Sequence, residues 1–416
     1  MARNRYMVYL VLLTFFVISL LTNILGPIVP DIISNFHVSL TAAGFLIFSF
    51  FIAYGVMSIP AGFLVERFTE KPVMISAFIA AAIGSMSFAL FPAYKVAVIS
   101  LFVIGAGMAV LQVAINPLLR VSGGEEHFAF NEVLAQLFFG SAAFISPHIY
   151  SYLVLNLNSN PLLRGLRKIT PAELPWVSLY WIFTVIAAVM VLVVCVSRFP
   201  RVQHTAEERP GTLQMYGSLV RQHTVWLYFL AVFAYVGCEQ GSVNWISQFL
   251  SQYHHLDPHT TGARAVARFW GLMTFGCLAG VLLLKIFDSR RVLIGASTGA
   301  LFFLTLALFG PDRISVVAFP LVGLFASVMW PILISLALNS VSEYHGSFTG
   351  ILGTAIIGGA VMPAVIGRIG DHFGLRNGLI LLYLTFGFIF SVGFWAKPLV
   401  NNATLRLTKT DLPTAV

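Results

Sequence analysis

Apolar runs, broken by charged or turn residues, recur along the whole chain. A helix that crosses a bilayer needs roughly 20 predominantly apolar residues, and twelve runs approach or exceed that length. These runs fall near 7–29, 40–64, 72–91, 97–119, 130–154, 175–197, 223–250, 262–285, 291–309, 314–339, 346–367 and 376–396. The pattern predicts an all-α integral membrane protein with twelve transmembrane helices.

A polar stretch rich in proline and charge divides these runs into two sets of six. We expect an N-terminal half (1–197), a cytoplasmic linker (198–222), a C-terminal half (223–398) and a cytoplasmic tail (399–416). The two halves resemble one another weakly in sequence. In both the fifth run and the eleventh, a glycine is followed several residues later by a proline. This repetition predicts two pseudo-symmetric six-helix halves.

Composition supports a membrane location. The 416 residues are 58% hydrophobic and 10% charged, whereas soluble proteins carry about 25% charged residues. With the N-terminus inside, 15 Lys and Arg lie on the inner side and 9 on the outer side, so both termini are expected in the cytoplasm. The net charge of +8 follows this topology and does not indicate nucleic-acid binding. We expect a multi-pass protein of the cell (inner) membrane.

We expect the N-terminal apolar run to be a first span and not a signal peptide, because it continues through Ile28 without a small-residue cleavage site. The three cysteines, Cys195, Cys238 and Cys277, all lie within predicted spans. They indicate neither a disulfide framework nor a metal site.

The fourth run ends in an unusually polar stretch, 111–120. Gln112 and Asn116 are one helical turn apart, so their amides share a face. Pro117 follows and removes a backbone donor. Amides are costly in hydrocarbon, so they normally face a bundle interior or a wet cavity. We expect Gln112, Asn116 and Gln136, with Asn23 in the first span, to form half of a substrate site; alternatively, Asn116 caps a carbonyl freed by the proline.

The seventh span carries the complementary set. Glu239 is an acid within the span, where an ionised carboxylate costs about 2.5–3.5 kcal/mol. It is a candidate sugar-hydroxyl acceptor or ion-coupling site; alternatively, it is a structural hydrogen-bond hub. Gln240 and Asn244 share a face next to Trp245. Amides beside an aromatic platform suit a sugar, although they also suit helix packing.

Further candidates are aromatic or charged. Trp270 and Trp330 are expected either to line the cavity or, more commonly for membrane aromatics, to pack. Charges at cytoplasmic span ends form a candidate inner gate of ion pairs, or else solvated charges that set topology: Glu66, Arg67, Glu70, Lys71, Arg120, Asp288, Arg290 and Arg291. The histidines at 254, 255 and 259 cluster outside, but their loop spacing does not predict a metal site.

Several motifs resemble one known family. They are Ile59-Pro-Ala-Gly62, Ala114-Ile-Asn-Pro117, His127-Phe128, Ala135-Gln136, Tyr235-Val-Gly237, Phe269-Trp-Gly271, Trp330-Pro331, Ser335-Leu336, Ile357-Gly-Gly359 and Pro363. Together they resemble the fucose–galactose–glucose branch of the major facilitator superfamily across nearly the whole chain. The resemblance implies a monosaccharide transporter that works by alternating access.

The chain departs from this family at three positions. The proton-coupled fucose member has acids where this chain has Gly26 and Gln112, and an arginine in its eighth span is replaced by Cys277. The resemblance thus implies sugar transport without the usual proton-titrating pair.

We therefore expect a secondary transporter that moves a hexose-type monosaccharide, either by facilitated diffusion or by coupling to Na⁺ or H⁺ through Glu239. The alternative is an exporter or flippase of an amphipathic small molecule or lipid, which 37 Phe residues permit. An enzyme is not expected, because no phosphate-binding loop, nucleophile–base pair or zinc spacing stands out. We expect no cofactor, no nucleic-acid partner and a monomer in the lipid bilayer.

Overall fold

The computed structural model describes residues 4–124, 128–200, 213–341 and 345–398, and every regular element among them is helical. The tail predicted at 399–416, and residues 201–212 of the linker predicted at 198–222, lie outside the described residues. The all-helical architecture expected from the apolar runs is confirmed.

Each half contains a similar series of helices. In the first half they are α1 Arg5–Thr22, α2 Leu25–Phe36, α3 Leu40–Phe68, α4 Glu70–Leu90, α5 Tyr94–Gly123, α6 Phe128–Asn156, η2 Pro161–Leu163, α7 Arg164–Ile169, η3 Pro175–Val177 and α8 Ser178–Val196. In the second half they are α9 Leu213–Val220, α10 His223–Val243, α11 Ile246–His254, η4 Pro258–Gly262, α12 Ala263–Ile286, α13 Ser289–Phe309, α14 Asp312–Ala326, α15 Met329–Leu338, α16 His345–Thr354, η5 Ala355–Ile357, α17 Gly358–Phe373 and α18 Leu375–Trp395.

Within the described residues, eleven helical segments are long and apolar enough to cross a membrane. The interrupted pair α10 and α11 occupies the place of the predicted seventh span, which completes the expected twelve. The first span is longer than its apolar run, since α1 and α2 together reach Phe36. Asp31, which the sequence placed beyond the first span, therefore lies within α2 and is 8% exposed.

Breaks within three spans follow from local chemistry. Pro27 has no N–H to bond the carbonyl of Asn23, and the first span breaks between α1 and α2 at that point. Pro331 likewise cannot donate to Ser327, where the tenth span breaks between α14 and α15, and the Cys277 thiol bonds that carbonyl at 3.3 Å. The seventh span breaks at Asn244 without any proline, where the Asn244 side chain donates to the Gln240 carbonyl at 2.9 Å.

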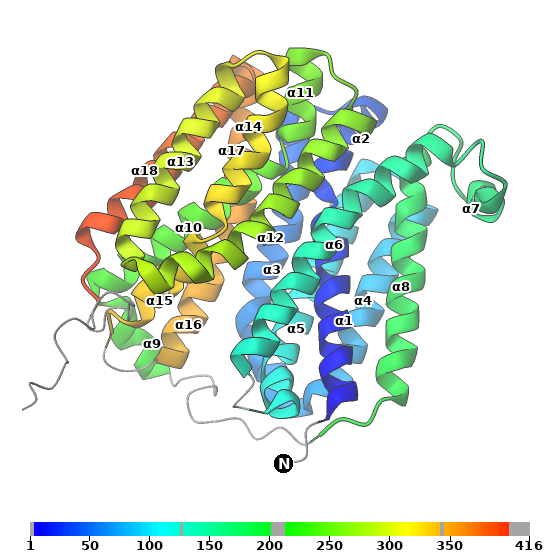
Figure 1. The fold of residues 1–416 in the computed structure, drawn as a ribbon. Coiled ribbons are helices and arrows are strands. Elements are labelled where there is room, and N and C mark those ends of the chain that lie inside the picture. Colours follow the sequence, from blue (N-terminus) through cyan, green and yellow to red (C-terminus); the bar gives the residue numbers. More distant parts are fainter. Residues whose placement is uncertain (1–3, 125–127, 201–212, 342–344, 399–416) are drawn as a thin grey trace, which may run out of the picture.

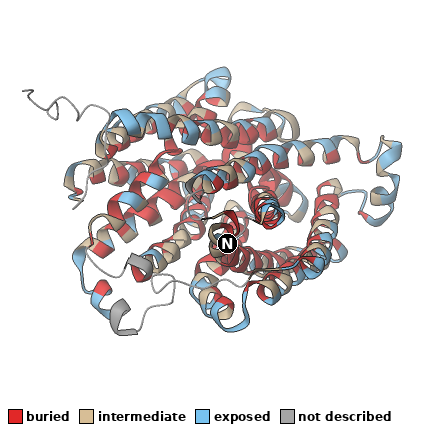
Figure 2. Ribbon diagram, turned by 60° about the horizontal axis from the view of Figure 1, so that its bottom comes forward, coloured by how far each residue is buried: buried red, intermediate tan, exposed pale blue. Residues whose placement is uncertain are grey.

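The principal packing pairs of the first half recur in the second. The pairs α3–α5, α4–α5, α4–α8 and α1–α6 correspond to α12–α14, α13–α14, α13–α18 and α10–α17. Seen from the N-terminal end, buried residues lie mainly on the inward-facing sides of the helices and exposed ones on the periphery (Figure 2). Each half is thus a packed bundle, as expected for a repeat.

The halves contact one another through α3 with α17, α6 with α12, and α2 with α11. They converge at the end of the bundle that carries α2, α11 and η4, which we call the closed end, and lie apart at the end that carries the N-terminus (Figure 1). Close approach across the interface depends on glycine: a Cβ at Gly140 in α6 would collide with Thr274 of α12. The interface between the halves therefore extends from the closed end into the bundle, where α3 also contacts α16 and η5.

Candidate functional site

A chain of polar side chains occupies the end of α10. Tyr235 Oη donates to Glu239 Oε2 at 2.7 Å, and Gln240 Nε2 donates to Glu239 Oε1 at 2.9 Å. Asn244 Nδ2 in turn donates to Gln240 Oε1 at 3.0 Å. Because the carboxylate and the two amides are linked head to tail, α10 presents one ordered polar group and not three separate ones.

This group retains unused chemical capacity. Glu239 is half-buried, and no Lys, Arg or His of the described residues forms an ion pair with it. A carboxylate has about four lone-pair sites, and an amide offers both donors and acceptors. The group is therefore suited to hydroxyls, to a proton or to a small cation.

The tryptophans have different surroundings. Trp330 is partly buried, and its ring lies 5.8 Å from that of Tyr235, beside the Glu239 group. Trp245 is fully buried near Gly367 of α17, and Trp270 is 5% exposed against Phe269. Their roles as cavity-lining residues stay predictions.

The first half contributes amides that are less constrained. Gln112 is half-buried on α5, while Asn116 and Gln136 are exposed although α5 packs against α1, α3, α4 and α6. Asn23 is 5% exposed and donates to Ser19 Oγ at 2.9 Å. The role of these four residues in substrate binding stays a prediction.

The breaks in the first and seventh spans lie side by side. A Cβ added to Gly26, near the start of α2, would lie 2.7 Å from the Val243 carbonyl oxygen and 3.2 Å from Asn244 Cα. Asn23, which follows α1, and Asn244, which follows α10, thus flank a crossing of the two halves. The polar end of α10 adjoins the interface between the halves.

Two of the predicted cytoplasmic gate residues, Lys71 and Arg290, make contacts within their own halves. Lys71 Nζ donates to the Cys195 and Ser197 carbonyls at 2.7 and 2.9 Å, which attaches the start of α4 to the end of α8. Arg290 pairs with Asp288 at 3.2 Å within one turn. The expected latch between halves stays a prediction for another conformation.

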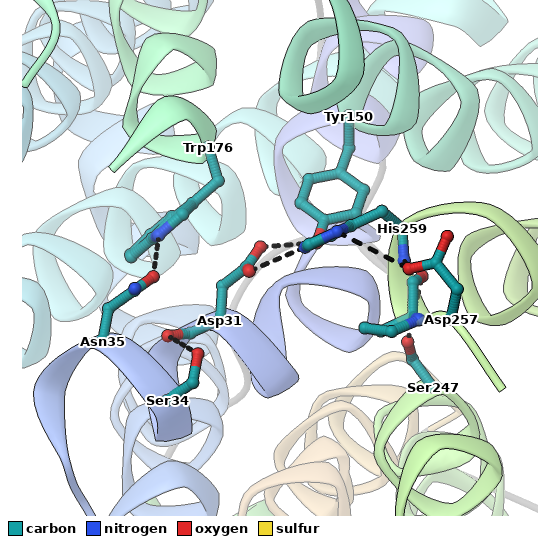
Figure 3. A network of polar contacts seen from close by, with 9 residues as sticks. Asp31, Ser34, Asn35, Tyr150, Trp176, Ser247, Asp257 and His259 are labelled. Carbon is teal, nitrogen blue, oxygen red and sulfur yellow. Dashed lines mark hydrogen bonds and ion pairs between the residues drawn. The ribbon is translucent and has the colours of Figure 1, made fainter. Parts of the chain in front are cut away.

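A second polar network joins the halves at the closed end (Figure 3). Asp31 of α2 accepts a hydrogen bond from Tyr150 Oη of α6 at 2.5 Å and contacts His259 Nε2 of η4 at 2.9 Å. His259 Nδ1 lies 3.6 Å from Asp257. This network crosses from the first half to the second. We name Asp31, Tyr150, Asp257 and His259 the outer network.

Sequence reasoning missed several of these functional groups. Tyr235 was recognised only as part of a motif, although its i, i+4 spacing to Glu239 predicts a shared face. Asp31 was missed because the first apolar run seemed to end before it. Glu132 of α6, whose Oε2 is buried without a hydrogen-bond partner, lies one turn before Gln136 and is a further acid within a span.

Comparison with known proteins identifies the family. The model of the Major Facilitator Superfamily matches residues 11–356. The chain belongs to the Major Facilitator Superfamily, and it is a multi-pass membrane protein and not an enzyme.

Curated relatives cover most of the chain. A glucose/galactose transporter of Brucella abortus biovar 1 (strain 9-941) is 28% identical over 390 residues, which are 91% of this chain and 90% of that protein. An L-fucose-proton symporter of Escherichia coli (strain K12) is 24% identical over 380 residues, 86% of each chain. These similarities extend over both halves.

Solved structures share the fold. FucP, a major facilitator superfamily transporter in the outward conformation, matches with a TM-score of 0.65 at 22% identity, over 94% of this chain and 98% of that chain. A bacterial homologue of the lysosomal transporter Spinster, inward-facing and unoccupied, matches with a TM-score of 0.76 at 14% identity, over 94% and 97%.

Proposed function

We propose that this member of the Major Facilitator Superfamily carries a hexose or related monosaccharide across the cell (inner) membrane by alternating access. The observation that carries the proposal is the hydrogen-bonded group Tyr235–Glu239–Gln240–Asn244 beside the interface between halves. A sugar presents a ring of hydroxyls, each of which both donates and accepts. Carboxylate, amide and phenol groups held in one chain match that chemistry.

The remaining polar residues would complete the site from the first half. Gln112 supplies a partly buried amide on α5, and Asn116 and Gln136 supply exposed amides on α5 and α6. The names of the curated relatives, a glucose/galactose transporter and an L-fucose-proton symporter, support a sugar as the substrate class. Trp330 would give the C–H face of the sugar an aromatic surface.

The conformation would be inward-facing. The distribution of Lys and Arg predicts that both termini lie in the cytoplasm. The closed end would then lie outside, and the opposite end, where the halves lie apart, would open to the cytoplasm. The cytoplasmic charges Glu66, Arg67, Lys71, Arg120, Asp288, Arg290 and Arg291 would then meet only when the halves rock the other way. The protein would act as a monomer, because each chain contains both halves.

The direct test is sugar counterflow in proteoliposomes that contain the purified full-length protein. We expect labelled glucose, galactose or fucose to enter vesicles preloaded with the same sugar. L-glucose should enter no faster than it enters vesicles without the protein. Thermal stabilisation by one of these sugars would support the same conclusion. Stabilisation by lipids or amphipathic drugs alone, without counterflow of any sugar, would instead support an amphipathic-molecule exporter.

Glu239 is the candidate site for coupling to H⁺ or Na⁺. Uptake driven by an imposed gradient of one cation in wild type, and lost with retained counterflow in Glu239→Gln, would assign coupling to this residue. Equal initial rates with and without either gradient would show facilitated diffusion. The name of the E. coli relative supports a proton as the coupling ion.

A further inference from the structure

The outer network joins two rigid parts of the protein that must separate during transport. Asp31 and Tyr150 belong to the first half, whereas His259 and Asp257 belong to the second. The Asp31–His259 contact spans 228 positions of sequence and is 2.9 Å long. Any rocking motion that opens the closed end must therefore break this contact.

Both sides of the network are held in place by their own half. On the first side, Trp176 Nε1 donates to Asn35 Oδ1 at 2.8 Å, which ties α2 to η3 (Figure 3). On the second side, Asp257 caps η4 by accepting from the His259 N–H at 3.1 Å and from Thr260 Oγ1 at 2.6 Å. The imidazole is thus presented to Asp31 by a fixed backbone and not by a freely moving loop.

The charges around His259 are negative or neutral. Its direct neighbours are Asp31, Tyr150 and Asp257. Burial raises the pKa of the Asp257 carboxyl, but the hydrogen bonds from Thr260 and from the His259 N–H outweigh burial and hold this pKa below its ordinary value. Asp257 is therefore an anion throughout the range in which a histidine titrates.

Other ionisable groups on the adjoining elements do not pair with His259. They are His37 after α2, His148 on α6, His254 and His255 at the end of α11, and Arg264 and Arg268 on α12. In the described part of the chain, none of them is hydrogen-bonded or ion-paired to the imidazole. Among the residues that the structure describes, no Lys or Arg forms an ion pair or hydrogen bond with the ring that would compete with a proton bound there.

We propose that His259 is a proton-binding site of the outer network, and that a proton taken up from the external side closes this end of the transporter. A protonated imidazole is attracted to the Asp31 carboxylate only when the halves are in contact. By thermodynamic reciprocity, a proton that binds the closed end more tightly also favours the closed end. External acidity then shifts the carrier toward its inward-facing state.

This proton site is separate from Glu239 and needs no bound sugar. The Glu239 group lies at the end of α10, before the break, whereas the outer network is built on α2, α6 and η4. The proposal rests on alternation between two conformations and not on the identity of the substrate. A conformational measurement can therefore test it even if the proposed sugar function is wrong.

The test places one spin label on each half in the full-length protein, in nanodiscs without sugar. Cys195, Cys238 and Cys277 are replaced by alanine, and exposed closed-end positions are labelled as Ser159→Cys and Arg313→Cys. Distance distributions are measured by pulsed electron paramagnetic resonance at about pH 5.5 and about pH 8, on either side of the ordinary histidine pKa. We expect the ratio of closed to open populations to be at least about fivefold higher at the lower pH.

Three variants make the assignment specific. His259→Gln and Asp31→Asn should each remove the pH response, and His259→Lys should favour the closed state at both pH values. His255→Asn, a nearby exposed histidine with no contact to Asp31, should respond as the parent protein does. Size-exclusion profiles show which variants are folded, and His259→Lys remains informative where a neutral variant is not.

A distribution in the parent protein that does not change with pH would overturn the proposal. So would a full pH response in folded His259→Gln. A response lost in His255→Asn and retained in His259→Gln would move the proton site to the other histidine and likewise overturn it.

Discussion

Gly26 of α2 lies directly against the backbone of Val243, at the end of α10. An alanine Cβ at position 26 would be 2.7 Å from the Val243 carbonyl oxygen, which is closer than Cβ atoms approach other heavy atoms in proteins. The two breaks in the first and seventh spans can therefore cross only because one of them carries no side chain. We expect this contact to be lost when the closed end opens.

We expect Gly26→Ala to destabilise the closed end selectively. Overpacking typically costs about 1–3 kcal/mol, so the closed population measured between the spin labels should fall while the protein remains folded. Gly62→Ala in α3 is the matched control, since a Cβ there meets no atom within 4 Å. Equal closed populations in the two variants would show that the crossing tolerates a side chain.

Much of the fold could be predicted from the sequence, because hydrocarbon leaves the backbone few options. Twelve apolar runs correspond to helices whose ends lie within several residues of the predicted limits. The breaks were less visible. Pro27 and Pro331 mark two of them by a missing donor, but the break at Asn244 depends on a side-chain amide that bonds a backbone carbonyl.

The polar groups were only partly predictable, for a different physical reason. Glu239, Gln240 and Asn244 are neighbours in sequence, so helical spacing alone placed them on one helix end. Asp31 and His259 are 228 positions apart, and their contact depends on how the halves pack. No periodicity encodes that distance, and His259 could be seen only as part of a histidine-rich loop.

We expect Tyr150→Phe to weaken the outer network without removing its pH response. The Tyr150 hydroxyl donates to Asp31 at 2.5 Å, and a hydrogen bond to a charged group contributes about 1.5–3 kcal/mol. The closed population should therefore fall at every pH, while a rise on acidification persists because His259 is unchanged.

Tyr152→Phe is the control for this prediction. Tyr152 Oη accepts a hydrogen bond from Asn160 Nδ2 at 2.6 Å within the first half, so its loss should not alter the closed population. A pH response that disappears in Tyr150→Phe would mean that the tyrosine, and not the histidine, controls the proton effect.

Asp371 of α17 caps the start of α3 across the interface between the halves. Its carboxylate accepts hydrogen bonds from the Leu40 and Thr41 N–H groups, both at 2.8 Å, and from the Thr41 hydroxyl. Loss of a helix N-cap typically costs about 0.5–2 kcal/mol, and this one is lost whenever the halves separate there. Asp371→Ala should therefore shift the equilibrium between the spin labels toward the open state.

Asn377→Ala removes a comparable surface hydrogen bond, from Asn377 Nδ2 to the Phe373 carbonyl at 2.7 Å, within the second half. It should leave the distance distribution unchanged. If Asp371→Ala behaves like Asn377→Ala, the cap does not contribute to closing the halves.

Lys71 gives a prediction about stability. Its ammonium donates to two carbonyls at the end of α8, and charge-assisted hydrogen bonds contribute about 1.5–3 kcal/mol when buried and less when exposed. Lys71→Met should lower the thermal unfolding midpoint of the purified protein, whereas Lys285→Met, at an exposed helix end, should not. An unchanged midpoint with slower transport would instead favour the inner-gate role expected from the sequence.

The last prediction concerns the acid in α10 and the tyrosine that orients it. Glu239→Gln removes the carboxylate but can still accept from Tyr235, whereas Tyr235→Phe keeps the carboxylate and removes one of its two donors. If a sugar hydroxyl binds Glu239, sugar affinity measured by isothermal calorimetry should fall about tenfold or more in Glu239→Gln, in line with a charge-assisted hydrogen bond. Tyr235→Phe should lower affinity less, because Gln240 still holds the carboxylate.

Tyr228→Phe is the control. The Tyr228 hydroxyl contacts Ser340 at 2.8 Å elsewhere in the second half, so this variant should bind sugar as the parent protein does. Equal affinity in Glu239→Gln and the parent protein would restrict Glu239 to coupling or to helix packing, and would leave the amides of Gln240 and Asn244 as the α10 groups that contact the sugar.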